Sequence, residues 1–335
     1  MDSVELYRSV VTSKFRTGKL LSFYDAIGDS EAKTTIYVGF GRQEPWADNE
    51  KDIGFAPPYP IDDVSGVSDM WTHMIGLMKV DKSLVDALIP RRDWGDSRYP
   101  NPRTFNIGDI VVTNSAPYNQ TDIGDGWKVY RVIDIPKTGV CSISNIKDKE
   151  ECIKLGGTWT PSYESVFPPK GRGDAEKGGL VDMEDGYLWE YLYTIPPDVS
   201  INRCTNEYIV VPTPDELGQD LERWGYEDNL SWQQNDNNLV YRLKVVTLRF
   251  RAFMDSVYFP EASWPGNNGF RQICVVINPL EKKQFPNDKN VKATKNYYRV
   301  SQVERHSGEM IYLENRPPIT RSIDQTELID LVFSF

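Results

Sequence analysis

The side chains that could carry out acid–base chemistry are few in this sequence. The chain has only two histidines, His73 and His306. Residues 306–309 bring a histidine, a serine and a glutamate together, but catalytic triads are assembled in space, so this adjacency is typical of a turn. His73 lies among methionine and tryptophan, where we expect a partly buried imidazole with a structural hydrogen bond. Neither histidine predicts a catalytic site.

Neighbouring carboxylates could supply the acid and the base of a glycoside hydrolase, and acidic groups beside aromatic loops also occur in sugar-binding sites. The chain, however, has 49 Asp and Glu residues against 38 Lys and Arg residues. Such pairs therefore arise without a function, and no spacing selects one of them. A glycan-binding or glycan-hydrolysing protein is the alternative to a structural protein, and its candidate carboxylates are Asp62 and Asp63, then Asp182, Glu184 and Asp185, and finally Glu227 and Asp228.

The remaining motifs give no cofactor or metal site. The four cysteines form no CxxC pair and have no zinc-ribbon spacing, and the chain contains no phosphate-binding glycine loop and no EF-hand pattern. We therefore expect no catalytic residue, cofactor or metal. Cys204 and Cys274 fall in strand-like contexts and are expected to be buried. Cys141 and Cys152 are close enough to pair as a local staple, and in a cytosolic product they are expected to start as free thiols, so the sequence leaves their redox state open.

Composition narrows the class of partner. The formal net charge of −11 argues against nucleic acid, because neutralising phosphates requires a basic face. The mean hydropathy is −0.50, and no apolar run approaches the roughly 20 residues of a membrane span. The first residues lack the apolar core of a signal peptide. We expect a protein that is used without export and without membrane insertion.

Residues 239–253 predict the central strand of the C-terminal third. Their apolar residues alternate with polar ones, which is the period of a strand buried on one side. The apolar set changes from odd to even numbers at Val245 and Val246, and such a shift moves later side chains to the other face. We expect a bulge or bend near Val245, with Leu243 and Leu248 on opposite sides of the sheet. Two short strands with an irregular joint are the simpler alternative.

The other elements follow from periodicity and from capping residues. Helices are predicted at 17–28, with Thr17 as the cap and Gly28 as a left-handed end, and at 68–80, 83–89 and 148–155. Strands are predicted at 34–40, 109–114, 127–135, 187–195, 207–211, 273–278, 309–314 and 326–335. A hairpin loop is predicted at 119–126, and rigid, proline-rich coil at 41–68.

Several longer segments have distinctive amino-acid sequences and follow one another in a distinctive order. They are 11–16 (VTSKFR), 41–46 (GRQEPW), 54–60 (GFAPPYP), 69–73 (DMWTH), 89–96 (IPRRDWGD), 185–192 (DGYLWEYL), 195–208 (IPPDVSINRCTNEY), 223–228 (RWGYED), 255–261 (DSVYFPE) and 306–312 (HSGEMIY). With these segments the chain closely resembles the baseplate wedge proteins of T-even-type contractile-tailed bacteriophages, over essentially its whole length.

The resemblance implies a structural, non-enzymatic subunit of the phage tail baseplate. It implies a homodimer that joins other baseplate wedge proteins in an ordered assembly in the host cytoplasm, becomes part of the virion, and takes part in baseplate rearrangement. It also implies a mainly β fold, a layered β-sandwich with two small α/β domains inserted into its loops. Combined with the predicted elements, this gives an N-terminal strand with a first α/β region at 1–104, sandwich strands at 105–136, an inserted domain at 137–186 and the main sandwich at 187–335.

A protein of this class is expected to work through anchors with few rotatable bonds, because they lose little entropy on docking. The sequence is rich in such residues, with 22 prolines, 18 tyrosines and 9 tryptophans. Tryptophan under a long loop is also a common small core, so each candidate has a structural alternative. Our candidates for interface anchors are Trp46, Tyr59, Trp94, Trp224 and Trp264.

Overall fold

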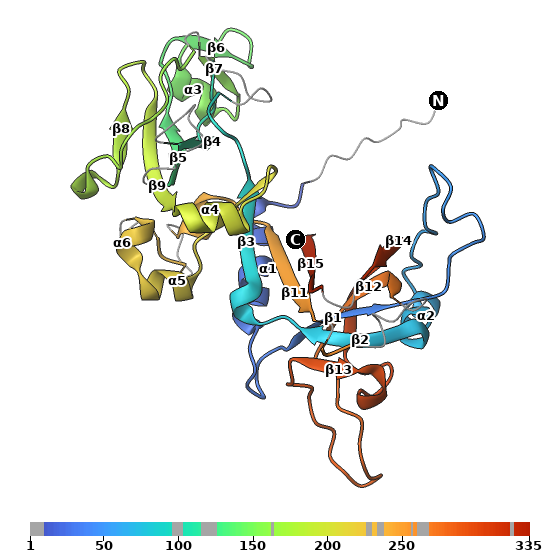
Figure 1. Ribbon diagram of the computed structural model, residues 1–335. Coiled ribbons are helices and arrows are strands. Elements are labelled where there is room, and N and C mark those ends of the chain that lie inside the picture. Colours follow the sequence, from blue (N-terminus) through green and yellow to red (C-terminus); the bar gives the residue numbers. More distant parts are fainter. Residues whose placement is uncertain are drawn as a thin grey trace. The chain divides into compact units, whose positions relative to one another are not determined.

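The structure is a computed structural model that describes residues 10–95, 103–114, 126–161, 164–225, 230–232, 238–255, 257–259, 268–321 and 325–335. Strands paired into antiparallel sheets dominate it, with short helices between them, which confirms the mainly β class (Figure 1). The chain forms two compact units. Residues 1–20, 86–247 and 334–335 make the first unit, and residues 21–85 and 248–333 make the second. The four-part division drawn from the sequence stays a prediction.

The first unit contains a four-stranded sheet in the order β4-β5-β9-β8. Its strands are β4 (Ile110–Asn114), β5 (Trp127–Asp134), β9 (Leu188–Ile195) and β8 (Leu180–Asp182). The predicted strands at 109–114, 127–135 and 187–195 are confirmed. Alternate residues of β9 place Trp189 and Tyr191 in an aromatic core with Phe105 and Tyr187, and the rings of Phe105 and Trp189 meet edge to face at 5.1 Å.

A small piece of the same unit is closed by a disulfide. It consists of β6 (Gly139–Cys141), α3 (Lys149–Lys154) and β7 (Trp159–Pro161), with Asp148 accepting the N–H of Glu151 as the helix cap. The predicted helix at 148–155 is confirmed. Cys141 and Cys152 are bonded, with their Cα atoms 5.8 Å apart, so the expectation of free thiols is wrong. Gly157 is required here, because a Cβ at this position would lie 2.9 and 3.0 Å from the two sulfurs.

The rest of the first unit links short helices to a strand pair. β3 (Val85–Pro90) pairs in antiparallel register with β10 (Tyr208–Val211), which was predicted. The helix predicted at 83–89 is wrong, since only Lys82–Leu84 form a short 3₁₀ turn before β3. The helices of this part are α4 (Pro197–Arg203), α5 (Pro214–Gln219), α6 (Leu221–Trp224) and α7 (Leu239–Arg242).

The second unit is organised around a five-stranded sheet in the order β13-β2-β1-β12-β14. Its strands are β13 (Tyr297–Arg299), β2 (Met74–Lys79), β1 (Ile36–Gly41), β12 (Gly269–Ile277) and β14 (Glu309–Thr320). The central strand β1 is buried at every position, so the sheet is covered on both faces. The strands predicted at 34–40, 273–278 and 309–314 are confirmed.

Each face of this sheet has its own covering layer. On one face, Tyr37 and Cys274 join Trp71 of α2 (Val64–His73) in a core that Tyr298 and Val303 complete. Toward the other layer, Tyr312 of β14 meets Phe333 of β15 (Glu327–Ser334), with ring centroids 4.9 Å apart. Phe333 in turn packs on Phe250 of β11 (Thr247–Met254), which lies beside β15. The layered sandwich is therefore confirmed, as is the predicted strand at 326–335.

The helix predicted at 68–80 is wrong in its second half. Asp63 caps α2, accepting the N–H groups of Ser65 and Gly66 at 2.6 and 3.1 Å. At Met74 the backbone becomes extended, and β2 pairs with β1. The spacing of Met70, Met74 and Leu77 fits a helix, but pairing with a buried strand outweighs local periodicity. All three side chains are buried in one core, on a helix and a strand in turn.

The N-terminal helix begins earlier than predicted. α1 spans Ser13–Ala26, and Thr17 lies inside it with no exposed surface, so Thr17 is not its cap. The cap oxygen comes from Thr12, which accepts the N–H of Phe15 at 3.3 Å. The predicted apolar stripe of Leu20, Leu21, Tyr24 and Ile27 is buried as expected. Gly28 does not have the predicted left-handed backbone.

The predicted continuous strand at 239–253 is wrong in its first half, and so is the placement of Leu243 in a sheet. Asn238 caps α7 by accepting the N–H of Tyr241 at 2.8 Å. Lys244 has φ +52°, and the N–H groups of Lys244 and Val245 return to the carbonyls of Tyr241 and Val240, which is the Schellman ending of a helix. The phase change predicted near Val245 is therefore a helix-to-strand junction. Leu248, Phe250 and Ala252 are buried on one face of β11, as predicted.

Two further expectations concern cysteines. Cys274 is fully buried, and this burial raises the pKa of its thiol to about 12. Cys204 is only partly buried, because it follows the end of α4 rather than lying within a strand. The hairpin loop predicted at 119–126 lies outside the described residues, apart from Gly126.

Candidate functional site

Two of the predicted anchors lie on the loop that joins β1 to α2, residues 42–63, which we name the acidic loop. Trp46 belongs to its stem. The indole Nε1 of Trp46 donates to the carbonyl of Arg316 at 3.1 Å, and the guanidinium of Arg42 lies 4.2 Å from the ring centroid. Tyr59 belongs to the outer part of the loop and is 92% exposed. The first ring holds the loop in place, and the second ring is free to meet a partner.

A buried ion pair fixes the stem of the acidic loop. Arg271 of β12 donates from Nε and Nη2 to the two carboxylate oxygens of Glu50, at 2.6 and 2.7 Å, and from Nη1 to the carbonyl of Gln43 at 2.5 Å. Glu50 also accepts the N–H of Trp46 at 2.8 Å, and its side chain is 6% exposed. The hydrogen bond from Arg271 lowers the pKa of Glu50, against the opposing effect of burial. The pair has the bidentate geometry that makes arginine–carboxylate contacts strong.

The other end of the acidic loop, near Pro58, is also fixed by contacts to the sheet and to α2. Asn315 of β14 donates to the carbonyl of Pro58 at 3.0 Å. The carbonyl of Ile61 lies so close to Gly66 that a Cβ there would approach it to 2.0 Å. Between these fixed points the loop carries apolar side chains that are more than half exposed, namely Ile53, Tyr59 and Ile61, with Val64 just beyond. Tethered apolar groups in water are typical of an interaction surface.

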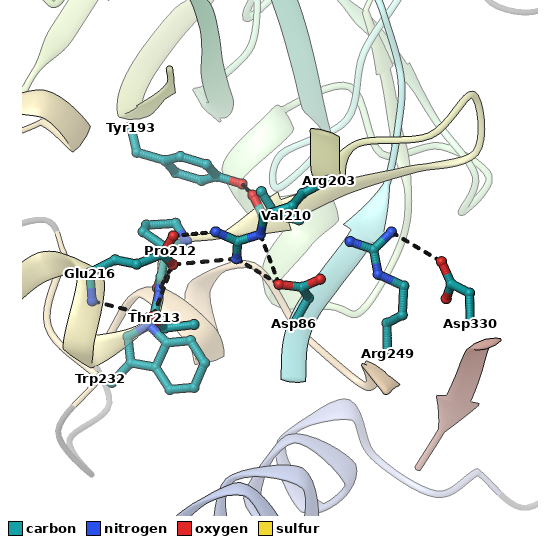
Figure 2. Close-up of polar contacts among 10 residues, drawn as sticks. All are labelled: Asp86, Tyr193, Arg203, Val210, Pro212, Thr213, Glu216, Trp232, Arg249 and Asp330. Carbon is teal, nitrogen blue, oxygen red and sulfur yellow. Dashed lines mark hydrogen bonds and ion pairs between the residues drawn. The ribbon is translucent and has the colours of Figure 1, made fainter. Parts of the chain in front are cut away.

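In the first unit, the main polar feature is an arginine held between two carboxylates (Figure 2). Arg203, the last residue of α4, donates to Asp86 of β3 from Nε at 2.9 Å and from Nη2 at 2.6 Å, and it also pairs with Glu216 of α5. Asp86 has no exposed surface. Burial lowers the pKa of Arg203, but its bonds to Glu216 and Asp86 outweigh this and raise it. Glu216 also closes the capping box of α5 with Thr213.

A hollow of about 280 Å³ lies beside this network, between α4, α5 and α6. Trp224 lines it but is itself 2% exposed. Arg223 pairs with Asp198, which lowers the pKa of that carboxyl. Because these charges neutralise one another, the hollow has no activated acid, base or nucleophile among its paired groups. Its lining consists of Asp198, Val199, Asn202, Arg203, Glu216, Gln219, Asp220, Arg223 and Trp224.

The structure therefore separates the predicted anchors rather than bringing them together. Trp94 is half-buried and stacks on Phe105, with ring centroids 5.6 Å apart, as part of the aromatic core of the first unit. Trp224 is also an internal residue of that unit. Trp46 and Tyr59 lie on the acidic loop of the second unit, and Trp264 lies outside the described residues.

Three of the candidate catalytic carboxylates have structural partners, and Asp62 and Glu184 are exposed. Asp63 caps α2, Asp182 accepts the N–H of Glu184 at 2.8 Å, and Asp185 accepts from the hydroxyl of Ser165 at 2.7 Å. Glu227 and Asp228 lie outside the described residues. His73 contacts Asp69 of its own helix at 3.1 Å, and the ring of His306 lies 6.0 Å from that of Trp71.

The described residues offer neither a metal site nor a membrane-spanning helix. No three or more His, Cys, Asp or Glu side chains within the described ranges are placed to bind a metal ion. Among the helices of the same described ranges, none is long and apolar enough to cross a membrane.

Sequence reasoning missed both buried arginine clamps. Arg271 and Glu50 are 221 residues apart, and Arg203 and Asp86 are 117 residues apart. Each of the four side chains is an ordinary polar residue in its local context, so a single sequence carries no signal for the pairing.

Comparison with known proteins gives one consistent result. The family model described as Bacteriophage T4, Gp8 matches residues 9–335. A relative from Enterobacteria phage T4, named baseplate wedge protein gp8, is 64% identical over 334 residues, which span 100% of this chain and 99% of the relative.

Proposed function

The chain belongs to the family of bacteriophage T4 Gp8 proteins, and we propose that it is a structural, non-enzymatic subunit of a phage tail baseplate wedge. In this proposal the subunit is a homodimer, and it joins other wedge proteins in an ordered assembly in the host cytoplasm. Its contacts then take part in the rearrangement of the baseplate. The single observation that carries the proposal is the 64% identity to a baseplate wedge protein over the full chain.

The geometry supports a protein that works through surfaces. The acidic loop is fixed at its stem by Arg271 and Glu50 and at its far end by Asn315, so its apolar side chains are held in position before any partner arrives. A preorganised anchor loses little entropy on docking. Of the five candidate anchors we retain Tyr59 as the direct contact and Trp46 as its support. Trp94 and Trp224 pack inside the first unit and are not retained as direct contacts.

Native mass measurement of the free chain tests the homodimer directly. A dimer of the 38.4 kDa chain is expected, and it should enter a larger complex when other wedge proteins of the same phage are added. Purified particles should contain the chain in their baseplates. A strict monomer that joins no wedge complex would overturn the proposal.

A further inference from the structure

A second loop of the same unit has the opposite charge to the acidic loop. It joins β12 to β13, spans residues 279–296, and is here named the basic loop. It contains five lysines and two carboxylates, whereas the acidic loop contains six carboxylates and two cations. Both loops are long excursions from the sheet of the second unit (Figure 1). One unit therefore carries two projecting surfaces of complementary charge.

Both loops also present apolar side chains. In the basic loop, Phe285 is 66% exposed and Val291 is 55% exposed. The stem of this loop is held by backbone bonds, from Glu281 N–H to the carbonyl of Val291 and from Ala293 N–H to that of Pro279, each 2.8 Å long. Fixed apolar groups within a charged rim are the usual composition of a protein interface.

Both loops carry charged side chains that face water in the described structure. Glu44, Asp48 and Asp52 in the acidic loop are exposed, as are Lys282, Lys283 and Lys289 in the basic loop. The charges with structural roles lie elsewhere, such as Glu50 in the clamp and Lys292, which donates to the carbonyls of Ser30 and Glu31. The exposed groups can therefore pair with a partner without breaking an internal contact.

The two loops belong to opposite edges of the five-stranded sheet. The acidic loop is bonded to Asn315 and Arg316 of β14, the outermost strand on one side. The basic loop leads directly into β13, the outermost strand on the other side. The acidic loop leaves β1 after Gly41, beside Gln272, whereas the basic loop leaves β12 after Ile277, beside Ile36, so the two loops also lie at opposite ends of the strands. A two-fold axis perpendicular to the line that joins the two loops would bring each acidic loop to a basic loop, in two identical contacts that close the dimer.

We propose that the homodimer forms through these loops, with the acidic loop of each copy docked on the basic loop of the other. Tyr59 and Ile61 meet Phe285 and Val291 at the centre, and the exposed carboxylates and lysines form the rim. The inference rests on the homodimer proposed above and assigns its interface. A second copy is the partner that fits, because its basic loop complements the acidic loop in charge and in apolar content.

Charge exchange between the loops tests this interface. One variant carries Glu44→Lys, Asp48→Lys and Asp52→Lys, a second carries Lys282→Glu, Lys283→Glu and Lys289→Glu, and a third combines all six. Sedimentation measures the dimer dissociation constant, and thermal unfolding confirms that each variant is folded. We expect each single-loop variant to weaken the dimer at least about tenfold, because reversal places like charges together. The combined variant should return to within about threefold of the wild type, because opposite charges again face each other.

A matched control changes the same net charge elsewhere. Glu150→Lys, Glu176→Lys and Glu207→Lys lie on exposed positions of the first unit, and we expect them to leave the dissociation constant unchanged. If the wild-type chain is a monomer, the proposed homodimer itself fails. If the wild type is a dimer and either reversal leaves it intact, or if the six-fold variant does not recover, the homodimer stands and this interface is overturned.

Discussion

The acidic loop and residues 197–224, here named the α4–α6 region, are both held by a buried arginine, but only the acidic loop exposes its aromatic side chain. In the acidic loop the guanidinium of Arg271 donates to Glu50. In the α4–α6 region the guanidinium of Arg203 donates to Asp86 and pairs with Glu216. In the acidic loop the prominent aromatic side chain, Tyr59, is 92% exposed. In the α4–α6 region it is Trp224, which is 2% exposed.

The position of the clamp explains the difference. Arg203 lies between three elements, so its bonds join β3, α4 and α5 around a common centre, and the nearby ring packs inward. Arg271 lies under the stem of a long loop, so its bonds fix the base and leave the outer residues without a core of their own. A buried ion pair can thus stabilise the interior of a unit, or it can fix the base of a loop whose outer residues stay exposed. The outcome depends on whether the residues next to the pair pack into a core or continue as a loop.

The largest effect is expected from Arg203→Ala. The substitution leaves the carboxylate of Asp86, which has no exposed surface, without this cation, and breaking a buried pair in this way costs about 3–5 kcal/mol. The measurement is the shift of the unfolding transition of the first unit in urea. Arg203→Lys, which keeps the charge but loses the planar fork, is the control and should cost less. A loss below about 1 kcal/mol would show that the clamp does not stabilise this region.

The two aromatic residues should separate stability from assembly. Trp224→Ala removes a buried ring and is expected to cost about 3 kcal/mol. Tyr59→Ala changes an exposed ring and should alter the free energy of unfolding by less than about 0.5 kcal/mol, while weakening dimerisation. Thermal unfolding and sedimentation of both variants provide the test. If Tyr59→Ala lowered the free energy of unfolding as much as Trp224→Ala does, Tyr59 would be a residue that supports the fold and not only a contact residue.

Arg271→Ala should act locally. Without the clamp the acidic loop opens more often, and trypsin cleavage after Lys51, an exposed residue of that loop, should become at least about tenfold faster. The melting temperature should fall less than in Arg203→Ala. Cleavage after Lys177 in the first unit, also exposed, is the internal control. Unchanged cleavage after Lys51 would mean that Arg271 does not hold the loop.

The smallest effect is a pH dependence that differs between the regions. Arg271 lowers the pKa of Glu50 below the unfolded value of about 4.3, so the contribution of this pair is complete above that pH and is lost as the pH falls through the folded pKa. The Trp46 indole N–H resonance should report the transition, and Glu50→Gln should remove it. Asp198 is lowered in the same way by Arg223, but both side chains are over 40% exposed, so water screens that pair and little change is expected there. A midpoint above 4.3 for Trp46 would contradict the assignment.

The sequence predicted β5 and β9 closely, because their long apolar and aromatic runs coincide with burial, whereas it placed the start of β12 four residues late. The prediction of secondary structure failed where a segment has the residue spacing of one element but forms another. Residues 68–80 have helical spacing, yet from Met74 they pair with β1 as a strand, because the neighbouring buried strand decides the conformation. Residues 239–245 alternate like a strand, yet Asn238 and Lys244 provide the cap and the left-handed end of a short helix.

For the candidate site, composition predicted aromatic, proline-rich loops but not their roles. Tyr59 and Trp224 are both aromatic residues in turn-rich segments, and only long-range contacts decide which ring is exposed. The clamps that decide this join residues more than a hundred positions apart, and no local pattern in the sequence encodes them.

We expect the acidic loop to contact partners, whereas the α4–α6 region supports the fold. Hydrogen exchange of the chain below and above its dimer dissociation constant tests it most directly. We predict added protection on dimerisation at residues 51–64 and 282–291 and no change at 197–224. Added protection confined to 197–224, with residues 51–64 unaffected, would contradict the account.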